Sequence, residues 1–363
     1  MTFSISLRMS EQNTAGRRLS EVCRFLVAAA FVLASGSAGI AATDETLSQD
    51  LPALQAPGSV ITYGDQNVPE GADLAYGAFQ RGFYLNALAI ATRNAGRGDR
   101  AAQTLLGLIY ENGYGVPQDL EKSASWYQLA GAAGDPQAQY RLGLLHLDGL
   151  GVEKSAAMAA DYFAKAAEAG QTSAAYNLGL FYLQGRVFNQ DFEQAAELFG
   201  TAASAGILDA QYGLALLYKR GQGLPRSDRD AVLWLERAAA NGHDAARVEL
   251  AIMVFNGVGT PKDETRAARL FKMAAEAGNP VAMNRLARLY AAGLGVEADP
   301  VEAGRWHIRA RQAGVSDLRL DGFFESLDPA TRDEAVKRAF PRPKNDARAL
   351  QPAEEEAPAP VSE

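Results

Sequence analysis

An internal repeat constrains this chain more than any other feature of its sequence. Glycine-rich stretches begin at residues 113, 149, 185, 221, 257 and 293, so the pattern recurs every 36 residues without insertion or deletion. Counted from residue 101, position 2 of each repeat is always Ala and position 6 is always Leu. A period of this length is typical of chains in which each repeat buries its apolar face by stacking on its neighbours.

Within a repeat, the spacing of the recurring residues predicts two antiparallel helices. Positions 2, 6 and 10 are Ala174, Leu178 and Tyr182 in the third repeat, and their four-residue spacing places them on one side of a first helix. Gly or Ala at position 7 lets another helix approach closely. Gly at position 13 ends the first helix, and Gly at position 34 ends the second. We therefore predict an all-α fold.

All three tryptophans occupy position 26, in repeats one, four and six: Trp126, Trp234 and Trp306. Aromatic side chains can form platforms for ligands. Their confinement to a single repeat position instead favours an interior slot in which they hold the helices together.

The pattern A-x-x-x-L-G-x-x-Y-x-x-G-x-G-V, followed by A-x-x-W-Y-x-x-A-A-x-x-G, resembles the Sel-1-like repeat, a relative of the tetratricopeptide repeat. The resemblance covers residues 101–316 as six repeats. It implies a right-handed α-solenoid that holds proteins or peptides, and it implies no reaction. Some exported bacterial members are periplasmic regulators that bind the sensor domain of a membrane kinase, while others bind peptides or cell-wall components.

The flanking segments are expected to close the solenoid or to extend from it. Residues 73–100 keep the end of a second helix, and we interpret them as a degenerate N-terminal capping repeat. Residues 317–340 contain Asp328-Pro329, a good N-cap and first-turn pair, and we expect a C-terminal helical cap there. Residues 43–72 and 341–363 are rich in proline and polar residues, which is typical of disordered segments.

The first 42 residues follow the plan of a secretory signal peptide. Four arginines precede an apolar run at 25–34, and small residues follow it. Because this run is well short of the roughly 20 residues that a membrane span needs, we expect cleavage between Ala38 and Ala42. We then expect a periplasmic monomer with no membrane span; the alternative is an uncleaved anchor.

Removal of this segment would change the chemistry available to the chain. Cys23 is the only cysteine, so the mature protein would have no disulfide, thiolate nucleophile or cysteine metal site. The segment also carries four of the 35 basic and two of the 43 acidic residues, which leaves 31 and 41 and a net charge of −10. This charge disfavours nucleic acid or anionic lipid as the main partner.

The titratable residues form no arrangement typical of an enzyme. The three histidines, His146, His243 and His307, lie at different repeat positions without metal-ligand spacing, and we interpret each as a packing residue. Four aspartates share position 19, where a carboxylate caps the second helix: Asp119, Asp191, Asp263 and Asp299. The Gly-x-Gly loops lack the preceding strand of a phosphate-binding loop. We therefore predict no catalytic residue, cofactor or metal.

The third repeat has an unusual loop, GRVFNQD, in which Val187 replaces the second glycine. Because valine resists a left-handed backbone, we expect this loop to follow another path, with Asn189 taking the turn. Phe188 stands where the first repeat has Val116. It either fills the same apolar pocket or, together with Arg186, faces a partner; the pocket is the favoured interpretation.

We predict the binding surface on the side of the first helix opposite to positions 2, 6 and 10. Positions 4, 8 and 11 of the second to fifth repeats lie there and are mostly apolar. They are Tyr140, Leu144, Leu147, Tyr176, Leu180, Leu183, Tyr212, Leu216, Lys219, Val248, Ile252 and Phe255. A helix that is apolar on both sides is buried on both or offers one side to a partner.

The resemblance to tetratricopeptide arrays places this side along a concave wall. There the tyrosines would stack from repeat to repeat and bind an extended or helical segment; alternatively, neighbouring helices cover it. We predict an exported adaptor whose partner is a protein or peptide, such as a membrane sensor or envelope protein. A cell-wall-acting enzyme and a purely structural envelope protein are the alternatives.

Overall fold

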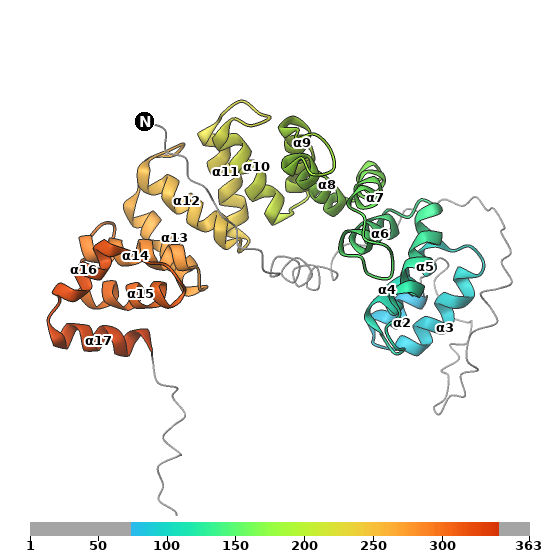
Figure 1. Ribbon diagram of the computed structural model, residues 1–363, viewed down its shortest axis with the longest axis horizontal. Helices are drawn as coiled ribbons and strands as arrows, with labels where there is room; N and C mark the ends of the chain where they lie inside the picture. The colour runs from blue at the N-terminus through green and yellow to red at the C-terminus, as the bar shows by residue number, and fades with distance from the viewer. Residues whose placement is uncertain (1–73, 341–363) are drawn as a thin grey trace, which may run out of the picture. The chain divides into compact units, whose positions relative to one another are not determined.

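The computed structural model describes residues 74–340, and every regular element in this range is an α-helix (Figure 1). Each repeat contains two helices. The first helices are α4 (Arg100–Asn112), α6 (Pro136–Asp148), α8 (Thr172–Gln184), α10 (Leu208–Arg220), α12 (Asp244–Asn256) and α14 (Pro280–Ala292). The second helices are α5 (Leu120–Ala132), α7 (Ala156–Glu168), α9 (Phe192–Ser204), α11 (Asp228–Ala240), α13 (Glu264–Glu276) and α15 (Pro300–Gln312). The predicted all-α solenoid of two-helix repeats is confirmed.

Shorter helices flank the repeats: α2 (Leu74–Gln80) and α3 (Tyr84–Ala95) precede them, and α16 (Leu318–Ser326) and α17 (Pro329–Ala339) follow. The helices form two compact units, and the boundary between these units lies within α8, after Leu178. We refer to them as the N-terminal and C-terminal units. The predictions made for 1–42, 43–72 and 341–363 fall outside the described residues.

The helix ends follow the repeated sequence closely. Asp119, Asp191, Asp263 and Asp299 all cap second helices by accepting backbone N–H groups, so the predicted capping role is confirmed. Ser155 and Ser227 do the same in the other two repeats. In every repeat the N–H of position 19 also donates to the carbonyl of position 10. This bond closes the loop between the two helices.

The glycines at position 34 are required by the backbone conformation. Gly134, Gly170, Gly206, Gly242, Gly278 and Gly314 have φ between 81° and 96°, a left-handed region that other residues resist. A Cβ atom added at any of them would meet no atom within 4 Å. Their recurrence therefore reflects left-handed helix ends, as predicted, and close packing plays no part in it.

The core of each repeat centres on position 27. The residues there are at most 3% exposed: Tyr127, Phe163, Phe199, Leu235, Phe271 and His307. A Cβ at position 7 would overlap the aromatic ring at position 27 in the first three repeats, as at Gly143 and Phe163. The predicted close approach of the two helices is therefore confirmed.

The interpretation that the tryptophans occupy the interior slot is correct only in part. Trp306 is buried, but Trp126 and Trp234 are half-buried at the edge of the core. Successive residues are about 100° apart around a helix, so position 26 lies at the edge of the side shared by positions 23, 27 and 30. That side carries the buried alanines as well as the large side chain at position 27.

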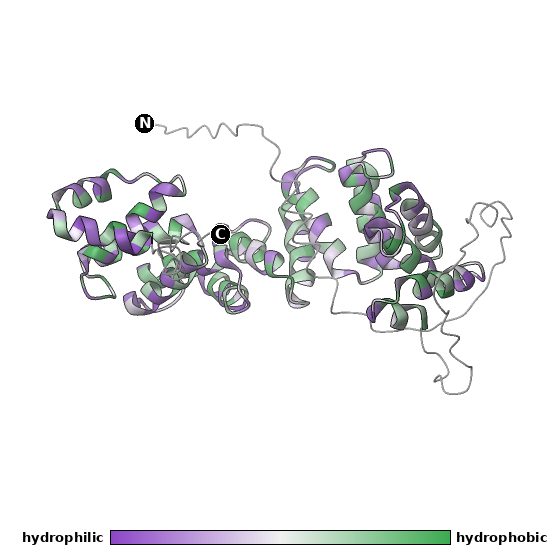
Figure 2. Ribbon diagram, turned by 90° about the horizontal axis from the view of Figure 1, so that it is seen from below, coloured by the Kyte–Doolittle hydropathy of each residue, from purple (hydrophilic) through white to green (hydrophobic). Residues whose placement is uncertain are grey.

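Hydrophobic and hydrophilic residues are interspersed along the helices, in keeping with one buried and one solvated side (Figure 2). Within residues 74–340, no helix has the length and apolar character needed to cross a membrane.

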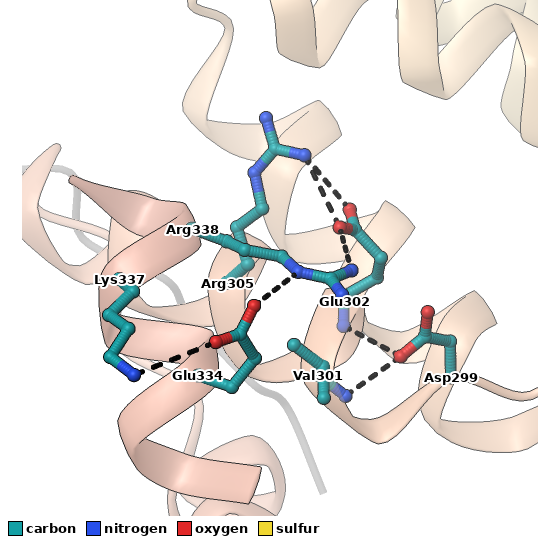
Figure 3. A network of polar contacts seen from close by, with 7 residues as sticks. All are labelled: Asp299, Val301, Glu302, Arg305, Glu334, Lys337 and Arg338. Atoms are coloured by element: carbon teal, nitrogen blue, oxygen red, sulfur yellow. Dashed lines mark hydrogen bonds and ion pairs between the residues drawn. The ribbon is translucent and has the colours of Figure 1, made fainter. Parts of the chain in front are cut away.

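The last helix, α17, packs on the second helix of the sixth repeat. Figure 3 shows Arg305 of α15 and Arg338 of α17 converging on Glu302, each 3.1 Å from a carboxylate oxygen. Arg338 also pairs with Glu334, at 3.1 Å. A Cβ added at Gly304 would lie 2.8 Å from the Cβ of Ala335, so glycine permits close contact between the helices. Asp328 caps α17, as predicted.

Candidate partner-binding surfaces

The predicted first-helix surface is partly covered in both units. In the N-terminal unit, Tyr140 is buried at 8% exposure, whereas Leu144, Leu147 and Tyr176 are half-buried. In the C-terminal unit, Val248 is buried at 7% exposure. The other residues of this unit are half-buried: Leu180, Leu183, Tyr212, Leu216, Lys219, Ile252 and Phe255. Tyr140 and Val248 therefore present little side-chain area, and the remaining residues present a shallow apolar surface.

Two of the tyrosines contact rings within their own repeats. The ring of Tyr140 lies 5.8 Å from that of Phe163, at the core of the second repeat. Tyr212 stacks on His243, with ring centroids 4.9 Å apart. Burial raises the pKa of Tyr212, and the nearby carboxylate of Glu249 raises it further. The Tyr212 hydroxyl therefore keeps its proton at neutral pH, while a ladder of tyrosines between repeats stays a prediction.

Ion pairs link position 11 of one first helix to position 5 of the next. In the N-terminal unit, Arg141 lies 3.3 Å from Glu111, which also accepts a 2.6 Å hydrogen bond from the Tyr127 hydroxyl. In the C-terminal unit, Lys219 pairs with Glu249. Lys219 thus has an ion-pair partner within the protein. A ligand at this surface would therefore contact mainly the apolar side chains beside Lys219.

Two of the histidines pack as predicted. His146 is buried and stacks on Tyr162, with centroids 5.5 Å apart. His307 is only 2% exposed, and its Nε2 lies 3.0 Å from an oxygen of Asp321. Burial lowers the pKa of His307, although the Asp321 carboxylate opposes this shift.

The interpretation of His243 as a packing residue missed its main role, which is to cap α12. Its Nδ1 accepts the backbone N–H of Ala246 at 3.0 Å, and its Nε2 lies 3.1 Å from Asp209. The accepting Nδ1 assigns the proton to Nε2. The sequence did contain a signal, because Asp135 and Asn279 cap helices from the same repeat position.

The unusual loop after α8 keeps the turn-and-bend pattern of its relatives, and a different local path at Val187 stays a prediction. Residues 185–188 show the same succession of turn and bends, and the N–H of Asp191 donates to the Tyr182 carbonyl as in the other repeats. Phe188 is half-buried and stacks on Tyr182, with centroids 4.8 Å apart. This contact favours local repacking, while Arg186 is exposed.

Two grooves on the second-helix side of the C-terminal unit were missed by the sequence reasoning. One, of about 420 Å³, lies between α9 and α11, with Leu214 and Tyr218 of α10 also lining it. The other, of about 500 Å³, lies beside α11 and the loop that follows α12. Both grooves are lined from the same repeat positions, 21, 24, 25 and 28 of one second helix and 15 and 16 of the following loop, but the residues at most of these positions differ.

Within residues 74–340, no group of three or more His, Cys, Asp or Glu side chains could hold a metal ion.

Comparison with known proteins agrees with the architecture. The Sel1 repeat model matches residues 100–135, 136–171, 172–207, 208–243, 244–279 and 280–315. The fold is similar to that of c5321, a protective antigen present in uropathogenic Escherichia coli strains displaying an SLR fold, with a TM-score of 0.66 and 29% identity over 73% of this chain and 61% of that one. It is also similar to a Sel1 repeat protein from Oxalobacter formigenes, with a TM-score of 0.60 and 28% identity over 66% and 98% of the two chains. No curated protein gives a significant sequence match.

Proposed function

Because the chain belongs to the Sel1 repeat family, whose members are generally non-catalytic protein-interaction scaffolds, we propose that it is an exported, periplasmic adaptor. It binds a protein or peptide partner, such as a membrane sensor or another envelope protein, and does not catalyse a reaction. The plan of residues 1–42 supports export. The chain spans only 61% of the length of c5321. The kind of partner is therefore inferred from the surface of this chain and not from c5321.

The apolar row on α10 and α12 carries this proposal. Tyr212, Leu216, Ile252 and Phe255 are half-buried, and they occupy the side of the first helices opposite to the buried leucines. Apolar side chains that remain partly solvated gain from being covered by a ligand. The Tyr212 hydroxyl adds a hydrogen-bond donor at the edge of the row.

Site-directed photo-crosslinking in the periplasm tests the surface. A photo-reactive amino acid placed at Leu216 or Ile252 should give discrete adducts with one partner. The same amino acid at Leu129 or Met158, which are exposed on second helices, should give none. Equal adducts at all four positions, or none at Leu216 and Ile252, would refute the proposal. Cell fractionation and N-terminal sequencing test export, with a mature N-terminus expected between residues 39 and 43.

A further inference from the structure

The groove between α9 and α11 has features that the internal packing of the protein does not explain. One side of α9 lines it with Glu193, Glu197, Gly200 and Ser204. Their spacing of four, three and four residues places them along a single face of the helix. Trp234 of α11 and Leu224 of the preceding loop also line it. The groove thus combines acidic and apolar side chains.

The neighbouring pair of second helices shows what the groove lacks. Glu236 of α11, at position 28, lies 2.6 Å from Arg266 of α13, at position 22 of the next repeat. One repeat earlier, the same two positions are Gly200 and Asp230. A glycine and an aspartate cannot form an ion pair, so α9 and α11 are not bridged at these positions.

Gly200 lies in the middle of α9, where glycine is less favourable than alanine. It is in helical conformation, and a Cβ added to it would meet no atom within 4 Å. Neither its backbone conformation nor contact with a neighbouring residue therefore requires glycine here. A ligand that approaches the backbone of α9 closely would require it.

The charges in the groove favour a cation. Glu193 and Glu197 are exposed and lie one helical turn apart, a spacing at which like charges repel. Neither forms an ion pair within residues 74–340. Trp234 lines the groove, and the guanidinium carbon of Arg237 lies 4.5 Å from the centroid of its ring. A lysine or arginine would pair with the carboxylates while its aliphatic stem packs on Trp234 and Leu224.

We propose that this groove binds an extended segment of a separate protein that carries a lysine or arginine side chain. The groove is a second binding surface, on the second-helix side of the repeats, in addition to the first-helix surface. The chain's own segment 43–73 cannot supply the cation, because it contains no lysine or arginine. The chain's tail contains Arg342, Lys344 and Arg348, so the experiment includes a truncated form.

Fluorescence anisotropy with defined peptide pools tests the proposal on the chain from residue 43 to 363. The probes are pools of 12-residue peptides with a central arginine or lysine, and an otherwise identical pool with a central glutamate. The basic pools should bind, and added salt should weaken their binding. Equal binding of basic and acidic pools, or no binding of either, would overturn the proposal.

Substitutions at matched repeat positions locate the site. Glu193→Gln with Glu197→Gln should weaken binding of the basic pool about five- to tenfold. Glu121→Gln with Asp161→Asn changes the same repeat positions in the N-terminal unit and should leave binding unchanged. If both double variants bind equally well, the groove is not the site.

A leucine at Gly200 separates binding from folding. Gly200→Leu should raise helix stability and weaken peptide binding at least about tenfold by filling the groove. Gly322→Leu is the control: Gly322 lies within α16, also has no atom within 4 Å of an added Cβ, and does not line the groove. Unchanged binding by Gly200→Leu would overturn the proposal. An affinity that rises on deletion of 341–363 would identify the tail as the occupant and overturn the assignment to a separate protein.

Discussion

The two junctions that α11 makes with neighbouring second helices share one construction but differ in their polar contacts. In both, the second glycine of a Gly-x-Gly loop lies against the start of the preceding second helix, Gly223 against Phe192 and Gly259 against Asp228. Only the junction with α13 is bridged by Glu236 and Arg266. The loops and first helices therefore carry the stacking, and the residues at positions 22 and 28 are free to vary. Their variation decides whether an ion pair crosses the junction, while a groove is present at both.

The largest expected effect is a loss of stability when a core leucine beneath either junction is replaced by alanine. Leu250→Ala should lower the free energy of unfolding by about 2–5 kcal/mol through lost burial and the cavity left behind. Leu214 is the equivalent residue and also lines the open groove. Leu214→Ala should cost less, because its cavity opens toward water. Urea unfolding followed by circular dichroism measures both, and equal costs would show that the groove floor is as closed as the neighbouring core.

The shared construction predicts similar costs at the two loop glycines. Gly223 and Gly259 have φ of 72° and 71°, and a Cβ at either would overlap a backbone carbonyl. Gly223→Val and Gly259→Val should each destabilise the protein by about 2–4 kcal/mol, from a strained backbone and steric overlap. Thermal unfolding measures the two costs. If only one valine were costly, the junctions would not be equivalent and the comparison would fail.

The unbridged junction between α9 and α11 can be converted to the bridged form. Gly200→Glu with Asp230→Arg places the residues of the α11–α13 bridge at the equivalent positions of the α9–α11 groove. The double variant should gain about 1 kcal/mol, mostly from removing a mid-helix glycine. It should also lose binding of basic peptides. Asp230→Arg alone is the control and should give little stability; a double variant less stable than the wild type would contradict the equivalence of the junctions.

The smallest expected effect is that of the existing bridge. The side chains of Arg266 and Glu236 are 36% and 40% exposed, so the pair is screened by solvent. Arg266→Gln should cost no more than about 0.5 kcal/mol, and less in high salt. Unfolding at two salt concentrations measures this difference. A cost above about 2 kcal/mol, independent of salt, would mean that the bridge carries the stacking after all.

Much of the local structure could be predicted because it depends on residues close in sequence. A capping aspartate needs only the three residues after it, and the left-handed glycine at position 34 needs only its own backbone. The buried leucines at position 6 followed from the helical period, and Leu178 is 7% exposed. The buried side of the second helix was harder to predict. Three tryptophans drew attention to position 26, which lies at the edge of the buried side, whereas the side chains at position 27 fill the core.

The candidate sites show where local reasoning stops. Tyr140 and Tyr212 occupy the same repeat position, yet one is buried against Phe163 and the other is half-buried on His243. The difference depends on residues about 23 and 31 positions further along the chain, which a helical period does not relate.

The sequence by itself determined the period, the two helices of each repeat, their caps and the identity of most core positions, since each follows from hydrogen bonds and spacings within a few turns of one chain segment. Only the tertiary structure decided how much of each side chain remains exposed and which pair of second helices is bridged by an ion pair. Exposure depends on what a neighbouring repeat places opposite a residue. At Gly200 that neighbour provides no ion pair, and at Glu236 it provides Arg266.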